Sequence, residues 1–129
     1  MTKPVELGDI KEGGYLMIDG EPCRTVSVEK SKPGKHGSAK ARIVAIGVFD
    51  GTKRSIVSPV DARVDVPIIE KRIGQVIAVL PGDTYQIMDL ETFETFDSKV
   101  DEELSGQLAQ GQEVEYWVIT GRRKVMRKR

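Results

Sequence analysis

The stretch YLMIDGEPCRTVSVE, residues 15–29, sets the pattern for the whole chain. Two runs rich in strand-forming residues, 15–18 and 24–29, stand on either side of the pair Asp19-Gly20. An Asp-Gly pair between two such runs is a strong signal for a β-hairpin, because both residues tolerate the left-handed backbone of a tight turn. We therefore expect an antiparallel sheet of short, tightly connected strands.

The same pattern continues through the rest of the first half. Further strand-like runs occupy 41–49, 54–57 and 62–66, and Asp50-Gly51 closes the first of them. Five short strands within about 65 residues predict a small antiparallel barrel.

A connector follows this first barrel. Pro67 interrupts strand pairing, and the charged residues after it favour exposure, so the stretch 66–72 is interpreted as a link between domains. We place the first domain at residues 1–69, a junction at 70–72 and the second domain at 73–129.

The second domain has its own order of elements. Acidic residues in the first turn and Gly111 at the end predict one short helix over 101–110. Strands, one short helix and further strands form the order of an OB-fold barrel. The predicted fold class is therefore all-β, two barrels with one short helix, the second barrel having strands at 73–80, 84–89, 92–96, 113–120 and 124–126.

Composition indicates a soluble chain. Of 129 residues, 39% are hydrophobic, and the longest apolar runs fall far short of the roughly 20 residues that span a bilayer. The N-terminal residues lack the apolar segment of a signal peptide, so we expect a cytoplasmic protein. The single cysteine, Cys23, cannot form an internal disulfide and is expected to be a small apolar residue on a strand.

The net charge of zero hides a strong local pattern. Residues 30–42 hold five bases and no acid, residues 73–120 hold ten acids and one base, and residues 122–129 hold six bases and no acid. Exposed charges are screened beyond about 8–10 Å, so the local charge matters more than the sum. The tail 122–129 is either a nucleic-acid patch or a solubilising terminus.

The basic segment SKPGKHGSAK, residues 31–40, is the leading candidate site. It places Lys35 between Gly34 and His36, and glycines permit backbone conformations and close approaches that other residues do not. The segment can present an amine to a polyanion, or it can be a solvated hairpin tip. It is not a phosphate-binding P-loop, because the required glycine-lysine spacing is absent.

Enzyme chemistry finds little support in the residues. A lysine nucleophile with His36 as its base would need an orienting partner, and no such arrangement is visible. The acids between 83 and 97 match no calcium loop. We expect no catalytic residue, no metal site and no bound cofactor.

The segment 31–40 strongly resembles the modification loop of the translation factor 5A family, the hypusine-containing factors of archaea and eukaryotes. Pro33 and Ser38 differ from the threonine and histidine frequent in eukaryotic members, which indicates an archaeal form. Bacterial elongation factor P is the related counterpart. The resemblance extends over almost the whole chain and includes 66–69, 72–78 and 88–92.

The resemblance implies an SH3-like first barrel and an OB-fold second barrel. It implies that deoxyhypusine synthase extends Lys35 with an aminobutyl group from spermidine, giving deoxyhypusine or hypusine. Members are not enzymes; they bind the ribosome and bring the modified lysine near the acceptor end of peptidyl-tRNA, notably at proline-rich stalls. The residues expected to contact RNA with it are Lys32, Gly34, His36, Gly37 and Lys40. A general RNA-binding or ribosome-associated protein with an unmodified basic loop is the alternative.

Overall fold

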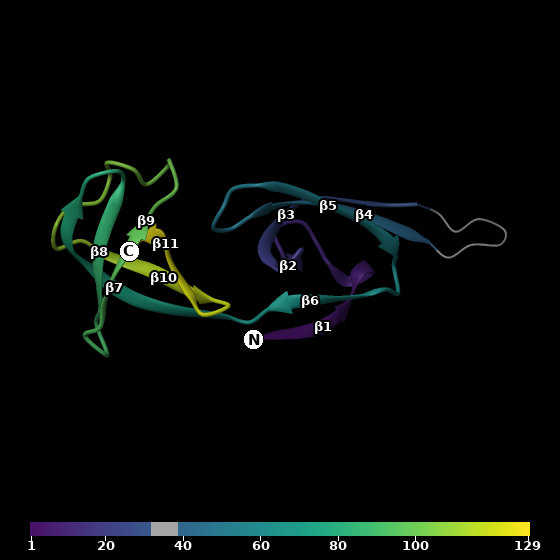
Figure 1. Ribbon diagram of the computed structural model, residues 1–129, viewed down its shortest axis with the longest axis horizontal. Helices are drawn as coiled ribbons and strands as arrows, with labels where there is room; N and C mark the ends of the chain where they lie inside the picture. Colours follow the sequence, from purple (N-terminus) through teal and green to yellow (C-terminus); the bar gives the residue numbers. More distant parts are fainter. Residues whose placement is uncertain (32–38) are drawn as a thin grey trace. The chain divides into compact units, whose positions relative to one another are not determined.

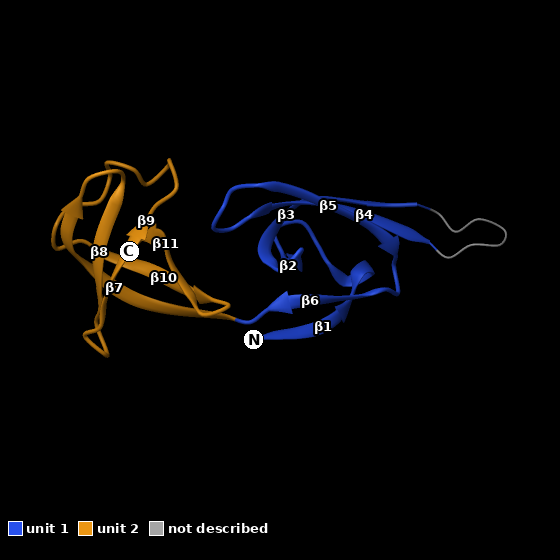
Figure 2. Ribbon diagram, viewed as in Figure 1, with its two compact units in different colours: residues 1–68 blue, residues 69–129 orange. Residues whose placement is uncertain are grey.

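The computed structural model describes residues 1–31 and 39–129, and it divides the chain into two compact units. Unit 1 is Met1–Ile68 and unit 2 is Ile69–Arg129 (Figure 2). Nearly all regular structure in the described residues is β-strand, as predicted. No helix of the described residues is long and apolar enough to cross a membrane.

Unit 1 is built from two antiparallel sheets. The larger has the strand order β2-β3-β4-β5, and the smaller pairs β1 with β6 (Figure 1). The predicted hairpin between β2 and β3 is confirmed, and Asp19 and Gly20 at its turn have φ angles of 52° and 78°. The elements are β1 (Thr2–Glu6), the 3-10 helix η1 (Leu7–Asp9), β2 (Tyr15–Ile18), β3 (Glu21–Lys30), β4 (Lys40–Gly47), β5 (Lys53–Pro59) and β6 (Arg63–Pro67).

The core of unit 1 is aliphatic. On β4, Ala41, Ile43 and Ala45 are buried while the residues between them are more exposed, so one face of the strand points into the barrel. The same cluster also contains Leu7, Ile10, Leu16, Ile18 and Cys23. Burial raises the pKa of the Cys23 thiol. Alternate burial along paired strands is what fixes the register of this sheet.

Strand β5 forms one edge of the larger sheet. Its exposed residues include Lys53 at the start and Pro59 at the end. The Arg54 side chain bonds to Asp50 across the turn that precedes the strand, at 2.7 Å between Nη2 and Oδ2.

Unit 2 is one five-stranded antiparallel sheet in the order β11-β10-β7-β8-β9. The sheet curls so that its outer strands meet, and the Val125 N–H donates to Ser98 Oγ across the seam at 3.2 Å. A five-stranded sheet closed in this way is the OB-fold arrangement. The strands are β7 (Ile69–Leu80), β8 (Thr84–Asp89), β9 (Thr95–Lys99), β10 (Glu113–Ile119) and β11 (Arg122–Lys128).

The core of unit 2 contains aromatic as well as aliphatic residues. Val76, Ile87 and Val114 are buried with Tyr116, whose ring lies 4.8 Å from that of Phe96. Gly74 allows β7 to lie close to β8, because a Cβ at this position would come within 2.6 Å of Ile87 Cγ2.

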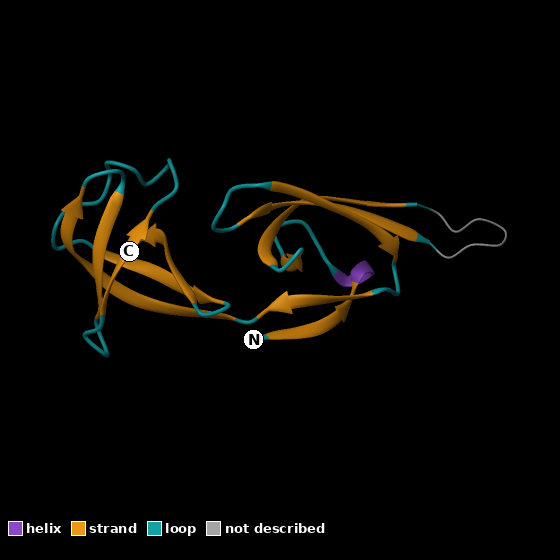
Figure 3. Ribbon diagram, in the orientation of Figure 1, coloured by secondary structure: helices purple, strands orange, loops and turns teal. Residues whose placement is uncertain are grey.

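The predicted helix over 101–110 is wrong. The segment folds as consecutive turns, with a single helical-type bond from the Ser105 N–H to the Asp101 carbonyl at 3.2 Å (Figure 3). Gly106 has a φ of +76°, which a right-handed helix does not accommodate, and its N–H donates to the Tyr85 hydroxyl at 3.0 Å. A tertiary contact with β8 therefore takes the place of helical hydrogen bonding.

Strand boundaries also differ from the sequence interpretation. Residues 70–72, assigned to a junction, lie inside β7, which begins directly after unit 1 ends. The strand expected at 92–96 begins at Thr95 instead, because the residues before it form the turn after β8.

Candidate functional site

The predicted site is described only at its margins. Lys32, Gly34, Lys35, His36 and Gly37 lie outside the described residues. The structure places the residues on either side, Ser31 after β3 and Ala39 before β4, and it places the predicted RNA contact Lys40 as the exposed first residue of β4.

The strands that carry the segment are anchored in the core of unit 1. Strands β3 and β4 pair antiparallel, and the register places Val28 opposite Ile43 and Lys30 opposite Ala41. Ile43 and Ala41 are fully buried, and Val28 packs against the same cluster. The chain therefore enters and leaves the candidate site from a firmly packed pair of strands.

A serine closes the strand pair at its end. The Ser31 N–H donates to the Lys40 carbonyl at 2.9 Å, and the Lys40 N–H donates to Ser31 Oγ at 3.1 Å. The hydroxyl thus accepts the bond that a backbone carbonyl would accept in a regular antiparallel pair. Ser31 Oγ also lies 3.3 Å from the Lys40 carbonyl, to which it donates.

Both ends of the segment are tied to other parts of unit 1. Lys30 Nζ donates to the Gly8 carbonyl in η1 at 2.8 Å. The Gly8 N–H donates to the Val60 carbonyl at 2.8 Å, and the Val60 N–H donates to the Ala39 carbonyl at 2.9 Å. Gly8 has little room for a side chain, since a Cβ there would lie 3.1 Å from Val60 Cβ.

The surface beside these bonds is basic. Lys30, Lys40 and Arg42 are exposed, and Glu29 lies opposite Arg42 in the register. Such a margin favours an anionic partner such as a nucleic acid backbone.

The basic tail is engaged within unit 2. Lys124 Nζ lies 2.7 Å from Asp101 Oδ1, and Arg127 Nε lies 2.7 Å from Glu115 Oε2. Arg123 pairs with Glu94 at 3.6 Å. Acidic residues earlier in unit 2 therefore neutralise much of the positive charge of β11, which favours a structural role for the tail.

A buried acid in unit 2, Asp89, is not among the residues predicted from the sequence. Asp89 is 2% exposed and accepts a bond from Arg72 Nε at 2.6 Å and another from the Tyr116 hydroxyl. The backbone N–H groups of Glu91 and Thr92 also donate to it, at 2.7 and 2.8 Å. The sequence offered only an acid at the end of an alternating strand, without any sign of its partners.

These contacts shift the pKa values of Asp89 and Tyr116 in opposite directions. The hydrogen bond from Arg72 holds the pKa of Asp89 well below its usual range, although burial opposes the shift. Burial, helped by Asp89, raises the pKa of Tyr116 to about 12. The carboxylate of Asp89 is fully occupied by neighbours, so this cluster stabilises the barrel.

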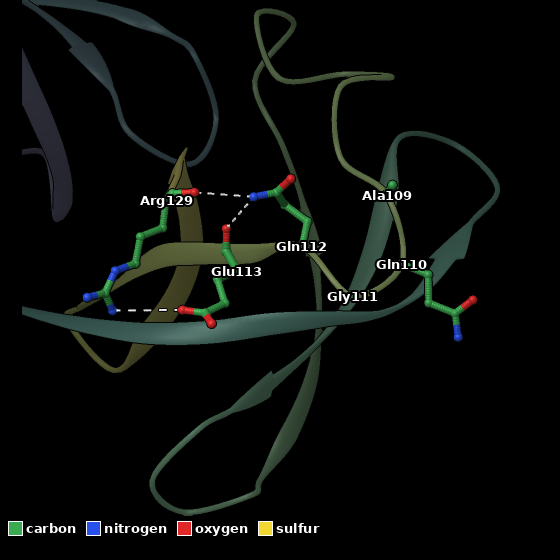
Figure 4. Close-up of a pocket in the computed structure, with 6 residues that line it drawn as sticks. All are labelled: Ala109, Gln110, Gly111, Gln112, Glu113 and Arg129. Carbon is green, nitrogen blue, oxygen red and sulfur yellow. Dashed lines mark hydrogen bonds and ion pairs between the residues drawn. The ribbon is translucent and has the colours of Figure 1, made fainter.

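A hollow of about 560 Å³ lies elsewhere on unit 2 (Figure 4). Its polar groups bond to one another: Gln112 Nε2 donates to the carbonyls of Glu113 and Arg129, and the side chains of Glu113 and Arg129 form an ion pair at 4.0 Å. None of the described residues that line this hollow was predicted to belong to the functional site.

Comparison with known proteins gives consistent matches. Residues 1–62 match the family model described as translation initiation factor 5A-like, N-terminal. Translation initiation factor 5A of Thermococcus kodakarensis is 60% identical over 122 residues, which cover 92% of this chain and 89% of that protein. The factor of the same name from Thermofilum pendens is 58% identical, with 99% of this chain and 98% of that protein covered.

A solved structure agrees over the full length. The eukaryotic translation initiation factor 5A from Methanococcus jannaschii is 49% identical and superposes with a TM-score of 0.91, covering 99% of this chain and 95% of that one. This likeness confirms the all-β fold, an SH3-like barrel followed by an OB-fold barrel. Sequence, fold and relatives therefore agree that the chain belongs to the translation initiation factor 5A family, in its archaeal form.

Proposed function

We propose that this translation factor binds the ribosome and places a modified Lys35 near the acceptor end of peptidyl-tRNA. Family membership supports a role in translation. The proposal rests on the segment 31–40, in which Lys35 stands between Gly34 and Gly37 in the sequence. The core-anchored strands on either side of it are joined by hydrogen bonds between Ser31 and Lys40. The protein acts in the cytoplasm and is not itself an enzyme.

The proposed modification uses Lys35 as an attachment point. Deoxyhypusine synthase transfers the aminobutyl group of spermidine to the Lys35 amine. A carbon–nitrogen bond of spermidine breaks, a new one forms to Lys35 Nζ, and 1,3-diaminopropane leaves with the proton that the lysine gives up. The exchange is redox-neutral overall. It converts a short cation into a longer arm with two amines.

The proposed effect on translation is one of position. Peptide-bond formation requires two bound reactants in a reactive geometry, and correct orientation alone can account for several kcal/mol of a barrier. A cationic arm beside the acceptor end helps to hold peptidyl-tRNA in that geometry, with the largest benefit where proline residues orient poorly. The flanking residues Lys32, His36 and Lys40 contact tRNA phosphates.

The first experiment is the mass of the protein purified from its native source. An aminobutyl adduct mapped to Lys35 supports the proposal. An unmodified Lys35 in a pool that is active in translation instead supports the alternative, a general RNA-binding or ribosome-associated protein with an unmodified loop.

The second experiment is the Lys35→Arg variant in a reconstituted translation assay with a run of prolines. Arginine keeps the charge but cannot accept the aminobutyl group, so we expect complete loss of the stimulation at prolines. Lys53→Arg is the matched control and is expected to retain it, since Lys53 is an exposed lysine at the start of β5, outside the candidate site. Full rescue of synthesis by Lys35→Arg would overturn the proposal.

A further inference from the structure

A closed circuit of hydrogen bonds surrounds the base of the candidate site. It runs from the Lys30 side chain to η1, from η1 to the connection after β5, from there to the residue before β4, and back across the strand pair. Every bond in it is between 2.8 and 3.1 Å. Its members are Gly8, Lys30, Ser31, Ala39, Lys40 and Val60.

Lys30 has a structural role, because its side chain makes a hydrogen bond within unit 1. The register places it opposite the buried Ala41, so its side chain leaves from the core-facing side of the sheet and reaches the Gly8 carbonyl. Holding one end of a long, exposed side chain costs conformational entropy. The bond nevertheless ties β3 to a segment 22 residues away in sequence.

Gly8 and Val60 form the opposite side of the circuit. Gly8 donates to Val60 and accepts from Lys30, so it links both ends of the candidate site. Its position is tightly limited, because a Cβ would lie 3.1 Å from Val60 Cβ and 3.2 Å from the Val60 carbonyl oxygen. A side chain at residue 8 would therefore displace the acceptor that Lys30 uses.

We propose that this circuit holds Ser31 and Ala39, the described residues on either side of 32–38, in the arrangement that deoxyhypusine synthase requires, with Lys30 and Ser31 as positioning residues. The inference rests on the proposed function, because it assumes that Lys35 is the modified residue. The circuit fixes Ser31 and Ala39, the two described residues between which the segment runs. The enzyme then meets a substrate in which Ser31 and Ala39 have one arrangement.

The circuit is expected to matter little for stability and much for the rate of modification. Opening the circuit frees only a few more residues, and the entropy of a loop grows so slowly with length that little stability is lost. A misplacement of about 1 Å at a reacting group can instead reduce a rate by about a hundredfold. Loss of the circuit should therefore affect modification far more than folding.

The test measures steady-state modification of the full chain by an archaeal deoxyhypusine synthase with spermidine. We expect Lys30→Met and Ser31→Ala to lower kcat/KM by about tenfold or more, mostly through kcat, with unchanged thermal unfolding. Ser31→Thr keeps the hydroxyl and should retain the wild-type rate. Lys53→Met removes the same charge from an exposed position in β5 and is the matched control.

A double-mutant cycle shows whether Lys30 acts through Gly8. Gly8→Ala is expected to lower kcat/KM, and adding Lys30→Met should cause little further loss, since both changes break the same bond. Independent, additive losses would mean that Lys30 contacts the enzyme directly and would overturn the inference. If Gly8→Ala does not fold, the single variants Lys30→Met and Ser31→Ala, compared with Lys53→Met, test the inference.

The outcomes separate this inference from the proposed function. A wild-type chain that the enzyme does not modify contradicts the proposed function. A wild-type chain that is modified, with Lys30→Met and Ser31→Ala modified at the same rate, contradicts the circuit alone.

Discussion

The two units place their polar networks differently. In unit 1 the notable bonds lie at the end of an aliphatic barrel, on exposed and half-buried residues, and mostly use the backbone. In unit 2 they lie inside, where Asp89 is buried beside Tyr116 and bonds to Arg72. The first network holds the margins of a segment, whereas the second holds a barrel together.

The contrast indicates which residues tolerate substitution. A buried carboxylate is stable only with its partners in place, and breaking such a pair is expensive because a charge is left without compensation. Bonds at an exposed strand end are replaced by water when they are lost, so little stability depends on them. Sensitivity of folding should therefore concentrate in unit 2, and sensitivity of function in unit 1.

The largest expected effect is that of Asp89→Ala. We expect unit 2 to lose about 3 kcal/mol of stability, at the lower end for a broken buried pair because the Arg72 side chain remains 23% exposed. The only tryptophan, Trp117, is buried in β10, so its fluorescence reports on unit 2. Hydrogen exchange at Ile43 in β4 reports on unit 1 and should not change.

Asp50 provides the control for this comparison. Its carboxylate bonds to Arg54 much as Asp89 bonds to Arg72, but it lies at the surface. Asp50 belongs to unit 1, so the readout for this variant is hydrogen exchange at Ile43, which Asp50→Ala should leave nearly unchanged. An equal loss of stability from both variants would remove the distinction between the two networks.

Acid should weaken unit 2 through the same carboxylate. Because the pKa of Asp89 is lower in the folded state, its stabilising effect is complete above the ordinary value near 3.9 and is lost as the pH falls below it. Thermal unfolding followed by Trp117 fluorescence should shift downward there. In Asp89→Asn this part of the pH dependence should be absent; an unchanged acid profile in that variant would assign the effect to other groups.

The smallest expected effect concerns the turns. In unit 1 the hairpin after β2 uses Asp19 and Gly20 at positive φ, whereas unit 2 places Phe93 at a φ of 63° in the turn after β8. Phe93 is 68% exposed, so it contributes little packing. Phe93→Gly should relieve strain and raise the stability of unit 2 by up to about 1 kcal/mol. A loss of stability would show that the aromatic side chain is held by contacts after all.

Much of the fold could be predicted because it depends on local signals. The Asp19-Gly20 pair and the alternation of residues 84–89 each fix a turn or a strand face within a few residues. The helix over 101–110 could not be judged in this way, because the Tyr85 hydroxyl that binds the Gly106 N–H comes from a distant strand. The sequence indicates a tendency to form a helix, but it does not show the tertiary hydrogen bond that competes with the helix.

In the candidate site, too, local features could be predicted and contacts with distant residues could not. The segment 31–40 stands out by its residue types, and the family is readable from it. The bond from Lys30 to Gly8 was not foreseen, since nothing local distinguishes a lysine that reaches a backbone carbonyl from one in solvent. The pairing of Asp89 with Arg72 was missed for the same reason, because the register of β7 against β8 brings these residues together.

Strand β5 has a consequence for association between molecules. An open sheet edge can accept a strand from another chain, which is a route to fibrils. Along this edge, Lys53 would have to give up its hydration to be covered, and Pro59 has no N–H to offer a new neighbour. The pair formed by β3 and β4 is thus available to a binding partner, while the edge strand β5 resists aggregation.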